Sequence, residues 1–201
     1  MTENELINAL NHDEGFRRLI FNATCFCMAA RIFPQHAESL INKLLSSPKE
    51  FRRIVKNADD LCRVASEYPE HRNAFIHLVL TDSEEFRRIV KNADDLCRVA
   101  SEYPEHKEAL IHPVLNNPEY FRLLVENIDE LGGVAWAYPE YKAALINSVL
   151  SNPKEFRRIV KNASDLCRVG SNCPEYKAAF IHSVLNNPKE FRLIVFWIGK
   201  H

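Results

Sequence analysis

The stretch FRRIVKNADDLCRVASEYPEH runs from Phe51 to His71 and returns without change from Phe86 to His106. Its leading phenylalanine recurs with a constant step of 35 residues, at Phe16, Phe51, Phe86, Phe121, Phe156 and Phe191. A fixed period of this length is typical of a tandem array, in which each unit buries its apolar face against its neighbours. Positions within a unit are counted below from this phenylalanine, which is position 0.

The units follow one another without a glycine-, serine- or proline-rich linker, and only five glycines occur in 201 residues. We therefore predict a single helical-repeat domain over residues 1–201. It consists of a half unit, five repeats and a second half unit, at 2–15, 16–50, 51–85, 86–120, 121–155, 156–190 and 191–201.

Each repeat opens with a helix signal. Ser or Asn followed by Pro precedes the phenylalanine at Ser47-Pro48, Asn117-Pro118, Asn152-Pro153 and Asn187-Pro188, as an N-cap and first helical residue would. Apolar residues then recur at helical spacing, which predicts a helix with one buried face. An asparagine recurs at position 6, as at Asn57, and a second cap there predicts a kink or a short break.

A proline at position 18 ends this segment and opens the next helix, at Pro34, Pro69, Pro104, Pro139 and Pro174. Apolar residues beyond it again fall on one helical face. Each unit is thus a helical hairpin of two helices or three. We predict an all-α fold, an α-solenoid of stacked helical hairpins wound into a right-handed superhelix. Pro113 lies inside one of the later helices, where a kink is expected.

The charges of the chain are balanced, with 26 basic and 27 acidic side chains and a formal net charge of −1. This balance gives no net attraction to nucleic acid or to an anionic membrane. The acidic N-terminus is unlike a secretory signal, and no apolar run approaches the ~20 residues of a membrane span. We expect a soluble, cytoplasmic protein without a membrane span.

Four of the six cysteines share position 11, at Cys27, Cys62, Cys97 and Cys167. Equivalent positions on packed helices are about 8–10 Å apart. A disulfide needs Cα atoms within about 7 Å. We therefore predict that these cysteines are reduced, small, buried side chains.

The 35-residue period, together with AALINSVLSNP from Ala143 to Pro153, resembles the tetratricopeptide class of α-solenoids, although the Trp, Leu-Gly and Tyr pattern of that class is absent. The recurring FRRIVKN, DL and YPE elements, which span nearly the whole chain, resemble helical repeats of effector proteins secreted by intracellular bacterial pathogens. That resemblance implies a location in the host cytosol and a partner that is a host protein or another bacterial effector. It implies no catalytic residue.

Catalysis and metal binding have little support in the sequence. The histidines form two columns at positions 20 and 26, which lie about 240° apart around a helix of 3.6 residues per turn. A closed zinc site needs four converging ligands, and an active site needs one asymmetric cluster rather than residues repeated along an array. We expect no enzyme activity, no cofactor and no metal.

An arginine stands at position 1 of every unit, at Arg17, Arg52, Arg87, Arg122, Arg157 and Arg192. Such a ladder could hold phosphates, so a nucleic-acid-binding repeat is the alternative function. We favour a structural interpretation, because Glu50, Glu85 and Glu155 stand three residues before arginines with which they can pair.

The repeat is broken from Gly132 to Ala137, where GGVAWA replaces CRVASE. Trp136 stands where other repeats have Ser66, Ser101 and Ser171, so we expect it to be at least partly exposed. An exposed tryptophan without surrounding charge has the composition of a binding hot spot. The other interpretation is that Trp136 fills the space left by the two glycines.

Apolar side chains also gather at the ends of the array, at Phe21, Phe26, Met28 and Ile32 and at Phe196, Trp197 and Ile198. They either fold back as caps, which we favour, or meet another chain. We thus predict a protein-binding scaffold. The candidate binding residues are Trp136, Ala137, Gly132 and Gly133, and the secondary candidates are Arg52, Arg87, Arg122 and Arg157.

Overall fold

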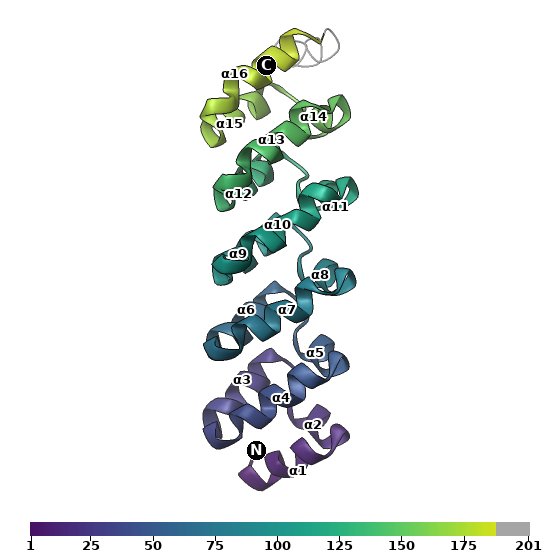
Figure 1. Ribbon diagram of the computed structural model, residues 1–201, viewed down its shortest axis with the longest axis vertical. Coiled ribbons are helices and arrows are strands. Elements are labelled where there is room, and N and C mark those ends of the chain that lie inside the picture. Colours follow the sequence, from purple (N-terminus) through teal and green to yellow (C-terminus); the bar gives the residue numbers. More distant parts are fainter. Residues whose placement is uncertain (188–201) are drawn as a thin grey trace. The chain divides into compact units, whose positions relative to one another are not determined.

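The computed structural model describes residues 1–187, and within this range the chain is helical with short connections and no strand (Figure 1). The all-α prediction is confirmed. The closing half unit at 191–201, with Phe196, Trp197 and Ile198, lies outside the described residues, as do the last three residues of the repeat at 156–190.

Each repeat contains three α-helices and a 3₁₀ turn, which decides between the two helix counts left open by the sequence. The first helix of a repeat begins three residues before its phenylalanine, and these residues are counted with that helix from here on. For Phe51 the helices are α5 (Pro48–Ile54), α6 (Ala58–Glu67), η2 (Pro69–His71) and α7 (Arg72–Leu80). We call α5, α6 and α7 and their equivalents the first, second and third helices of a repeat.

The predicted break at position 6 is real, and the side chains around it explain it. The Asn57 side-chain oxygen accepts a hydrogen bond from the Asp60 N–H at 2.9 Å. The Asp60 carboxylate in turn accepts one from the Lys56 N–H at 3.0 Å. These two bonds satisfy backbone donors at the start of a new helix, so the first and second helices are separate although their apolar stripes stay in phase.

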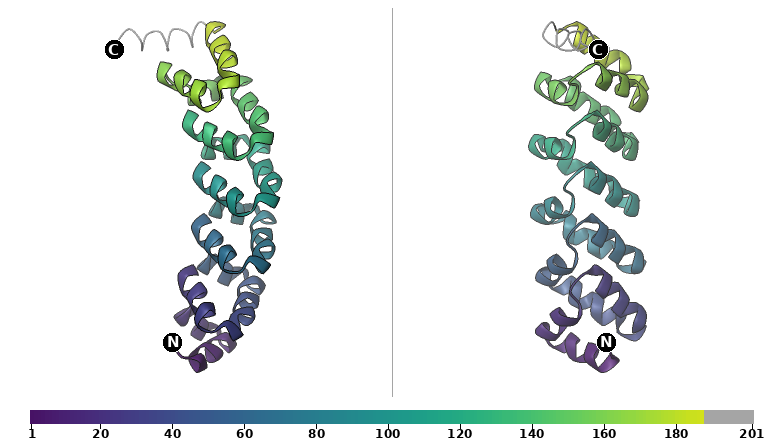
Figure 2. Two further views of the ribbon diagram at one scale, coloured as in Figure 1. Left: turned by 90° about the vertical axis from the view of Figure 1, so that its left-hand side faces the viewer. Right: turned by 180° about the vertical axis from the view of Figure 1, so that it is seen from behind.

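The chain divides into two compact units, and each is described by itself. Unit 1 comprises Met1–Val90 with Ser101–Pro104. Its helices are α1 (Glu3–Asn11), α2 (Asp13–Leu19), α3 (Ala23–Ile32), η1 (Pro34–His36), α4 (Ala37–Ser46), α5, α6, η2, α7 and α8 (Ser83–Ile89). The second helices α3 and α6 lie side by side, and the first helices α2, α5 and α8 form a separate row (Figure 1; Figure 2).

Unit 2 comprises Lys91–Ala100 and the described residues from Glu105 onward. Its helices are α9 (Ala93–Glu102, whose last two residues belong to unit 1), η3 (Pro104–His106), α10 (Lys107–Asn116), α11 (Pro118–Leu124), α12 (Ile128–Ala137), η4 (Pro139–Tyr141), α13 (Lys142–Leu150), α14 (Pro153–Ile159), α15 (Ala163–Asn172), η5 (Pro174–Tyr176) and α16 (Lys177–Leu185). Pro113 lies inside α10, which stays unbroken from Lys107 to Asn116.

All six cysteines lie in the described part of the chain and are free. Cys27 is buried and Cys62 and Cys97 are half-buried, but Cys167 is exposed, so the prediction of burial is wrong for Cys167. Position 11 faces the second helix of the following repeat, and α15 is the last second helix among residues 1–187. Burial raises the pKa of the Cys27 thiol to about 11, so this thiol stays protonated at neutral pH.

Candidate functional site

Adjacent repeats are held together at their first helices by a buried glutamate and two arginines, which we call the clamp. In the first clamp Glu50 is 2% exposed. Its Oε1 accepts a hydrogen bond from Arg17 Nε of the preceding repeat at 2.7 Å. Its Oε2 accepts two from Arg53, at 2.8 Å from Nε and 2.6 Å from Nη2. Arg53 Nη1 also donates to the Ile20 carbonyl at 2.5 Å, so the two repeats are joined twice, by Arg17 with Glu50 and by Arg53 with Ile20.

The same clamp recurs later in unit 1. Arg52 of one repeat pairs with Glu85 of the next. Arg88 donates to Glu85 through Nε at 3.1 Å and Nη2 at 2.6 Å, and to the Val55 carbonyl through Nη1 at 2.6 Å. Glu85, like Glu50, is buried. Several charge-assisted hydrogen bonds offset the free-energy cost of removing this carboxylate from water, so the glutamate can be buried in the clamp.

Unit 2 contains a third clamp at the corresponding positions. Arg122 Nε donates to Glu155 Oε1 at 2.5 Å. Arg158 Nε donates to Glu155 Oε2 at 2.9 Å, and its Nη1 to the Val125 carbonyl at 2.5 Å. In both Glu50 and Glu155 burial opposes the charged form, but the hydrogen bonds and positive charges of the two arginines outweigh it. The pKa of each carboxyl therefore lies below its ordinary value.

The clamp accounts for three arginines of the ladder, Arg17, Arg52 and Arg122. Arg17, Arg52 and Arg122 each pair with a glutamate of the following repeat, 33 residues away, and Arg87 and Arg157 also hold interactions. The predicted pairing of Glu50, Glu85 and Glu155 with the arginines three residues later is confirmed. These contacts favour the structural interpretation of the ladder.

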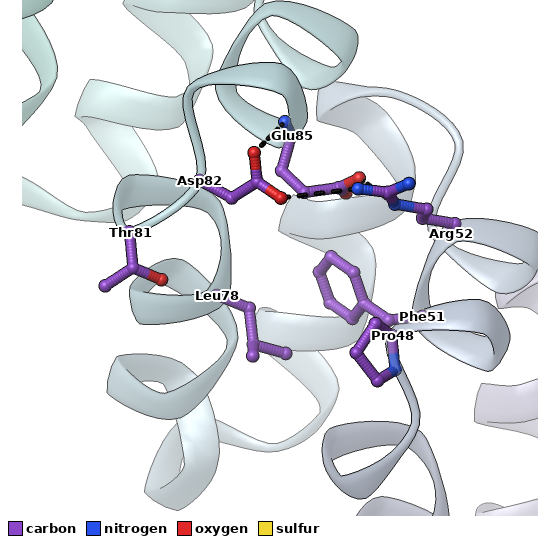
Figure 3. Close-up of a pocket in the computed structure, with 7 residues that line it drawn as sticks. All are labelled: Pro48, Phe51, Arg52, Leu78, Thr81, Asp82 and Glu85. Atoms are coloured by element: carbon purple, nitrogen blue, oxygen red, sulfur yellow. Dashed lines mark hydrogen bonds and ion pairs between the residues drawn. The ribbon is translucent and has the colours of Figure 1, made fainter.

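A pocket of about 200 Å³ lies beside the second clamp, lined by Pro48, Phe51, Arg52, Leu78, Thr81, Asp82 and Glu85 (Figure 3). Asp82 caps α8 through the Glu84 and Glu85 N–H groups and also accepts a hydrogen bond from Arg52 at 3.3 Å. A smaller pocket, of about 100 Å³, recurs in unit 2 with lining residues Leu115, Pro118, Phe121, Ser148, Asn152 and Glu155. Because the polar groups of the larger pocket are engaged in capping and in the clamp, we assign it to the fold rather than to a ligand.

The second helices contact one another through a different set of positions. In unit 1, Thr24 and Arg31, at positions 8 and 15 of α3, meet Arg63 and Glu67, at positions 12 and 16 of α6. In unit 2, Asp129 at position 8 of α12 pairs with Arg168 at position 12 of α15. Positions 8, 11 and 15 of a second helix therefore face the following repeat, and positions 12 and 16 face the preceding one.

Trp136 is 85% exposed, which confirms the expectation of exposure. It stands at position 15, through which Arg31 contacts the following repeat in unit 1, but the indole itself is left uncovered. The other interpretation, in which Trp136 fills space left by the glycines, is contradicted by this exposure. Asp129 and Gly133 are exposed on the same helix. Trp136 is the most exposed of the large apolar side chains in residues 1–187.

The other three residues assigned to this site have different surroundings. Ala137 is 8% exposed, so its methyl group is no part of a surface, and its carbonyl accepts a hydrogen bond from Lys107 Nζ at 2.9 Å. Gly132 is buried: a Cβ built on it would lie 2.8 Å from the Cβ and Nδ2 atoms of Asn172. Only Gly133 shares the exposed face, and a Cβ there would meet nothing within 4 Å.

These environments reduce the candidate site to Trp136 and the small, uncharged surface of Gly133. Gly132 has a packing role, because it lets Asn172 of the next repeat approach α12 closely. The helix itself is well fixed, since Asn127 caps it through the Asp129 and Glu130 N–H groups at 3.0 Å. The exposed indole therefore projects from a helix with an ordered N-terminus.

Sequence reasoning missed the contact between repeats that Glu50, Glu85 and Glu155 make. The signal was present, because Glu at position −1 and Arg at positions 1 and 2 recur together around Phe51, Phe86 and Phe156. Around Phe121, Tyr120 replaces the glutamate and Leu123 replaces the arginine at position 2.

No group of three or more His, Cys, Asp or Glu side chains that could hold a metal ion occurs in residues 1–187. Over the same range no helix has the length and apolar character needed to cross a membrane. Comparison of the chain with protein-family models, with curated proteins and with solved structures finds no match in any of the three.

Proposed function

We propose that this protein is a non-catalytic scaffold that binds another protein, with Trp136 as the main contact. The observation that carries the proposal is the 85% exposure of Trp136 on a helix face from which the repeat has lost its usual charges. Tryptophan is enriched among the residues that contribute most to protein–protein affinity. The second and third repeats carry Arg and Glu at positions 12 and 16, where this repeat has Gly133 and Ala137, so a partner can cover the indole without desolvating charged groups there.

The surroundings of Trp136 favour binding with little loss of conformational freedom. Val134 and Ala135 are buried on the opposite side of α12, and Asn127 fixes its start. Only the χ angles of the indole remain to be ordered by a partner, which lowers the entropic cost of association. A flexible loop carrying the same tryptophan would pay more of that cost.

The class of partner follows from the resemblance to repeats of bacterial effector proteins. On this basis the partner is a host protein or another effector, and the site of action is the host cytosol. The three-helix repeat differs from the two-helix tetratricopeptide unit. The resemblance to that class is therefore limited to the length of the repeat and gives no information about the partner.

Affinity capture from a eukaryotic cytosolic lysate tests the proposal, with the wild-type chain and Trp136→Ser side by side and the retained proteins identified by mass spectrometry. Serine is the residue of three other repeats at this position, so the variant should fold, as far-UV circular dichroism would check. Leu123→Arg is the matched control, because it also replaces an exposed apolar side chain of unit 2 with the residue of other repeats.

We expect a partner held by wild type and by Leu123→Arg to lose about tenfold or more in affinity with Trp136→Ser, as for a hot-spot residue. Equal retention by all three chains would contradict the role of Trp136. Loss with Leu123→Arg alone would place the contact on α11 instead.

A further inference from the structure

The first repeat has an apolar stripe in place of a charged one. Positions 5, 9, 12 and 16 carry Lys, Asp, Arg and Glu in both the second and the third repeat. The first repeat carries Phe21, Cys25, Met28 and Ile32 at these four positions. We call these four residues the α3 stripe, although Phe21 lies just before α3 and only the other three lie on it. Three of the four residues are more than half exposed: Phe21 at 56%, Met28 at 53% and Ile32 at 56%.

These exposures overturn the interpretation of the N-terminal apolar residues as a cap that folds back. Only Phe26 of that group is buried. It packs edge-on against Tyr68 of the next repeat, with ring centroids 5.8 Å apart. The large side chains of the α3 stripe instead point to solvent.

The contacts of the second helices show which side of α3 the stripe occupies. Positions 8 and 15 of α3 are engaged with α6, through Thr24 and Arg31. Positions 12 and 16 face the preceding repeat, as the contacts of Arg63 and Glu67 with α3 demonstrate. Met28 and Ile32 hold positions 12 and 16, so these two residues of the stripe lie on the stacking surface of the second helices.

The chemistry of the stripe restricts what can cover it. Inside the array this surface is polar: Arg63 bonds to Thr24, and Glu67 to Arg31. The α3 stripe has no charge, so it fits only a partner surface that is itself apolar and uncharged. Among the second helices in residues 1–187, α3 alone is uncharged at all four positions. The outward positions of α15 carry Ser164, Cys167 and Ser171, which are too small and polar to match it.

We propose that the α3 stripe is a dimerisation surface that pairs with the α3 stripe of a second copy of this chain. A twofold axis presents the same patch on both sides, so the surface formed by Phe21, Met28 and Ile32 of one copy packs on the same surface of the other. The contact uses the helix face by which the repeats already stack. With three large side chains per copy the surface is small, and the dimer is expected to be weak, with a Kd on the order of 10–100 μM.

Sedimentation velocity of the full chain from about 1 to 300 μM, a range that brackets the expected Kd, tests this proposal. The test variant is Met28→Arg with Ile32→Glu, which restores the residues of the second and third repeats and should fold. Leu123→Arg is the control, since it replaces an exposed apolar side chain elsewhere with the same kind of charged residue.

We expect wild type and Leu123→Arg to dimerise reversibly and the double variant to raise the Kd about tenfold or more. Phe21→Lys alone should raise it in the same direction. A wild-type chain that stays monomeric over the whole range would overturn the proposal. A dimer that the double variant leaves unchanged would overturn it too, because association would then use another surface.

Discussion

Neighbouring repeats meet at their first helices and at their second helices. The residues in contact are of the same types at three junctions of the first helices, but they differ at the second helices. At the first helices the clamp recurs at three junctions with the same atoms in the same roles, around Glu50, Glu85 and Glu155. At the second helices the contact is Arg63 with Thr24 in unit 1 and Arg168 with Asp129 in unit 2. The α3 stripe and the face of Trp136 both lie on second helices.

This difference teaches that one row of contacts holds the repeats and the other is free to carry surface chemistry. The clamp buries a charge, so any loss of a partner there leaves a costly unpaired group. The outer positions of the second helices are solvated, so arginine, methionine, glycine or tryptophan can stand there with little effect on the fold. The proposed binding and dimerisation surfaces lie where a substitution has little effect on the stability of the fold.

The largest effect is expected from breaking a clamp with Glu50→Ala. The variant removes the acceptor shared by Arg17 and Arg53, and we expect the free energy of unfolding to fall by ~2 kcal/mol, since both arginines keep some contact with water. Urea unfolding followed by circular dichroism measures the change. Lys49→Ala, next to it and exposed, is the control and should stay within about 0.5 kcal/mol of wild type. Equal shifts for the two variants would show that the clamp does not hold the repeats.

A smaller effect, with opposite signs, is expected from the two glycines of α12. Gly132→Ala places a Cβ 2.8 Å from Asn172, so we expect a net destabilisation of about 1–2 kcal/mol despite the better helix propensity of alanine. Gly133→Ala meets no neighbour and should stabilise by about 1 kcal/mol. Thermal unfolding of the two variants gives the comparison. Stabilisation by both would mean that Asn172 moves away freely and that the close approach has no packing role.

The smallest effect is expected from acid, through the clamps. The pKa values of Glu50 and Glu155 are lowered from 4.5 in the folded chain. Their stabilisation is therefore present above that ordinary value and is lost as the pH falls through the lowered folded-state values. Wild type should exceed Glu50→Gln/Glu155→Gln in stability at pH 7, and the gap should narrow in acid. Urea midpoints between about pH 7 and 3 measure it, and a gap that does not change with pH would contradict the assignment.

Much of the fold could be predicted because its signals are local. The caps at Ser47 and Asn117, the break at Asn57 and the proline that opens the third helix all act within four residues. The exposure of Trp136 was also predictable, since other repeats have serine at its position. Ala137 was named as a binding residue together with Trp136, but its side chain is buried, because consecutive residues on a helix point about 100° apart at 3.6 residues per turn.

By itself, the sequence determined the 35-residue period, the helical character and the residues at which the helices begin, because these depend on capping and on the spacing of apolar side chains. Only the tertiary structure decided that Glu50 is buried between two arginines, one of them 33 residues away, that Gly132 lies under Asn172, and that Met28 and Ile32 remain exposed. The physical reason is that burial and pairing depend on which side of each helix a neighbouring repeat covers. That side is determined by how the repeats stack on one another.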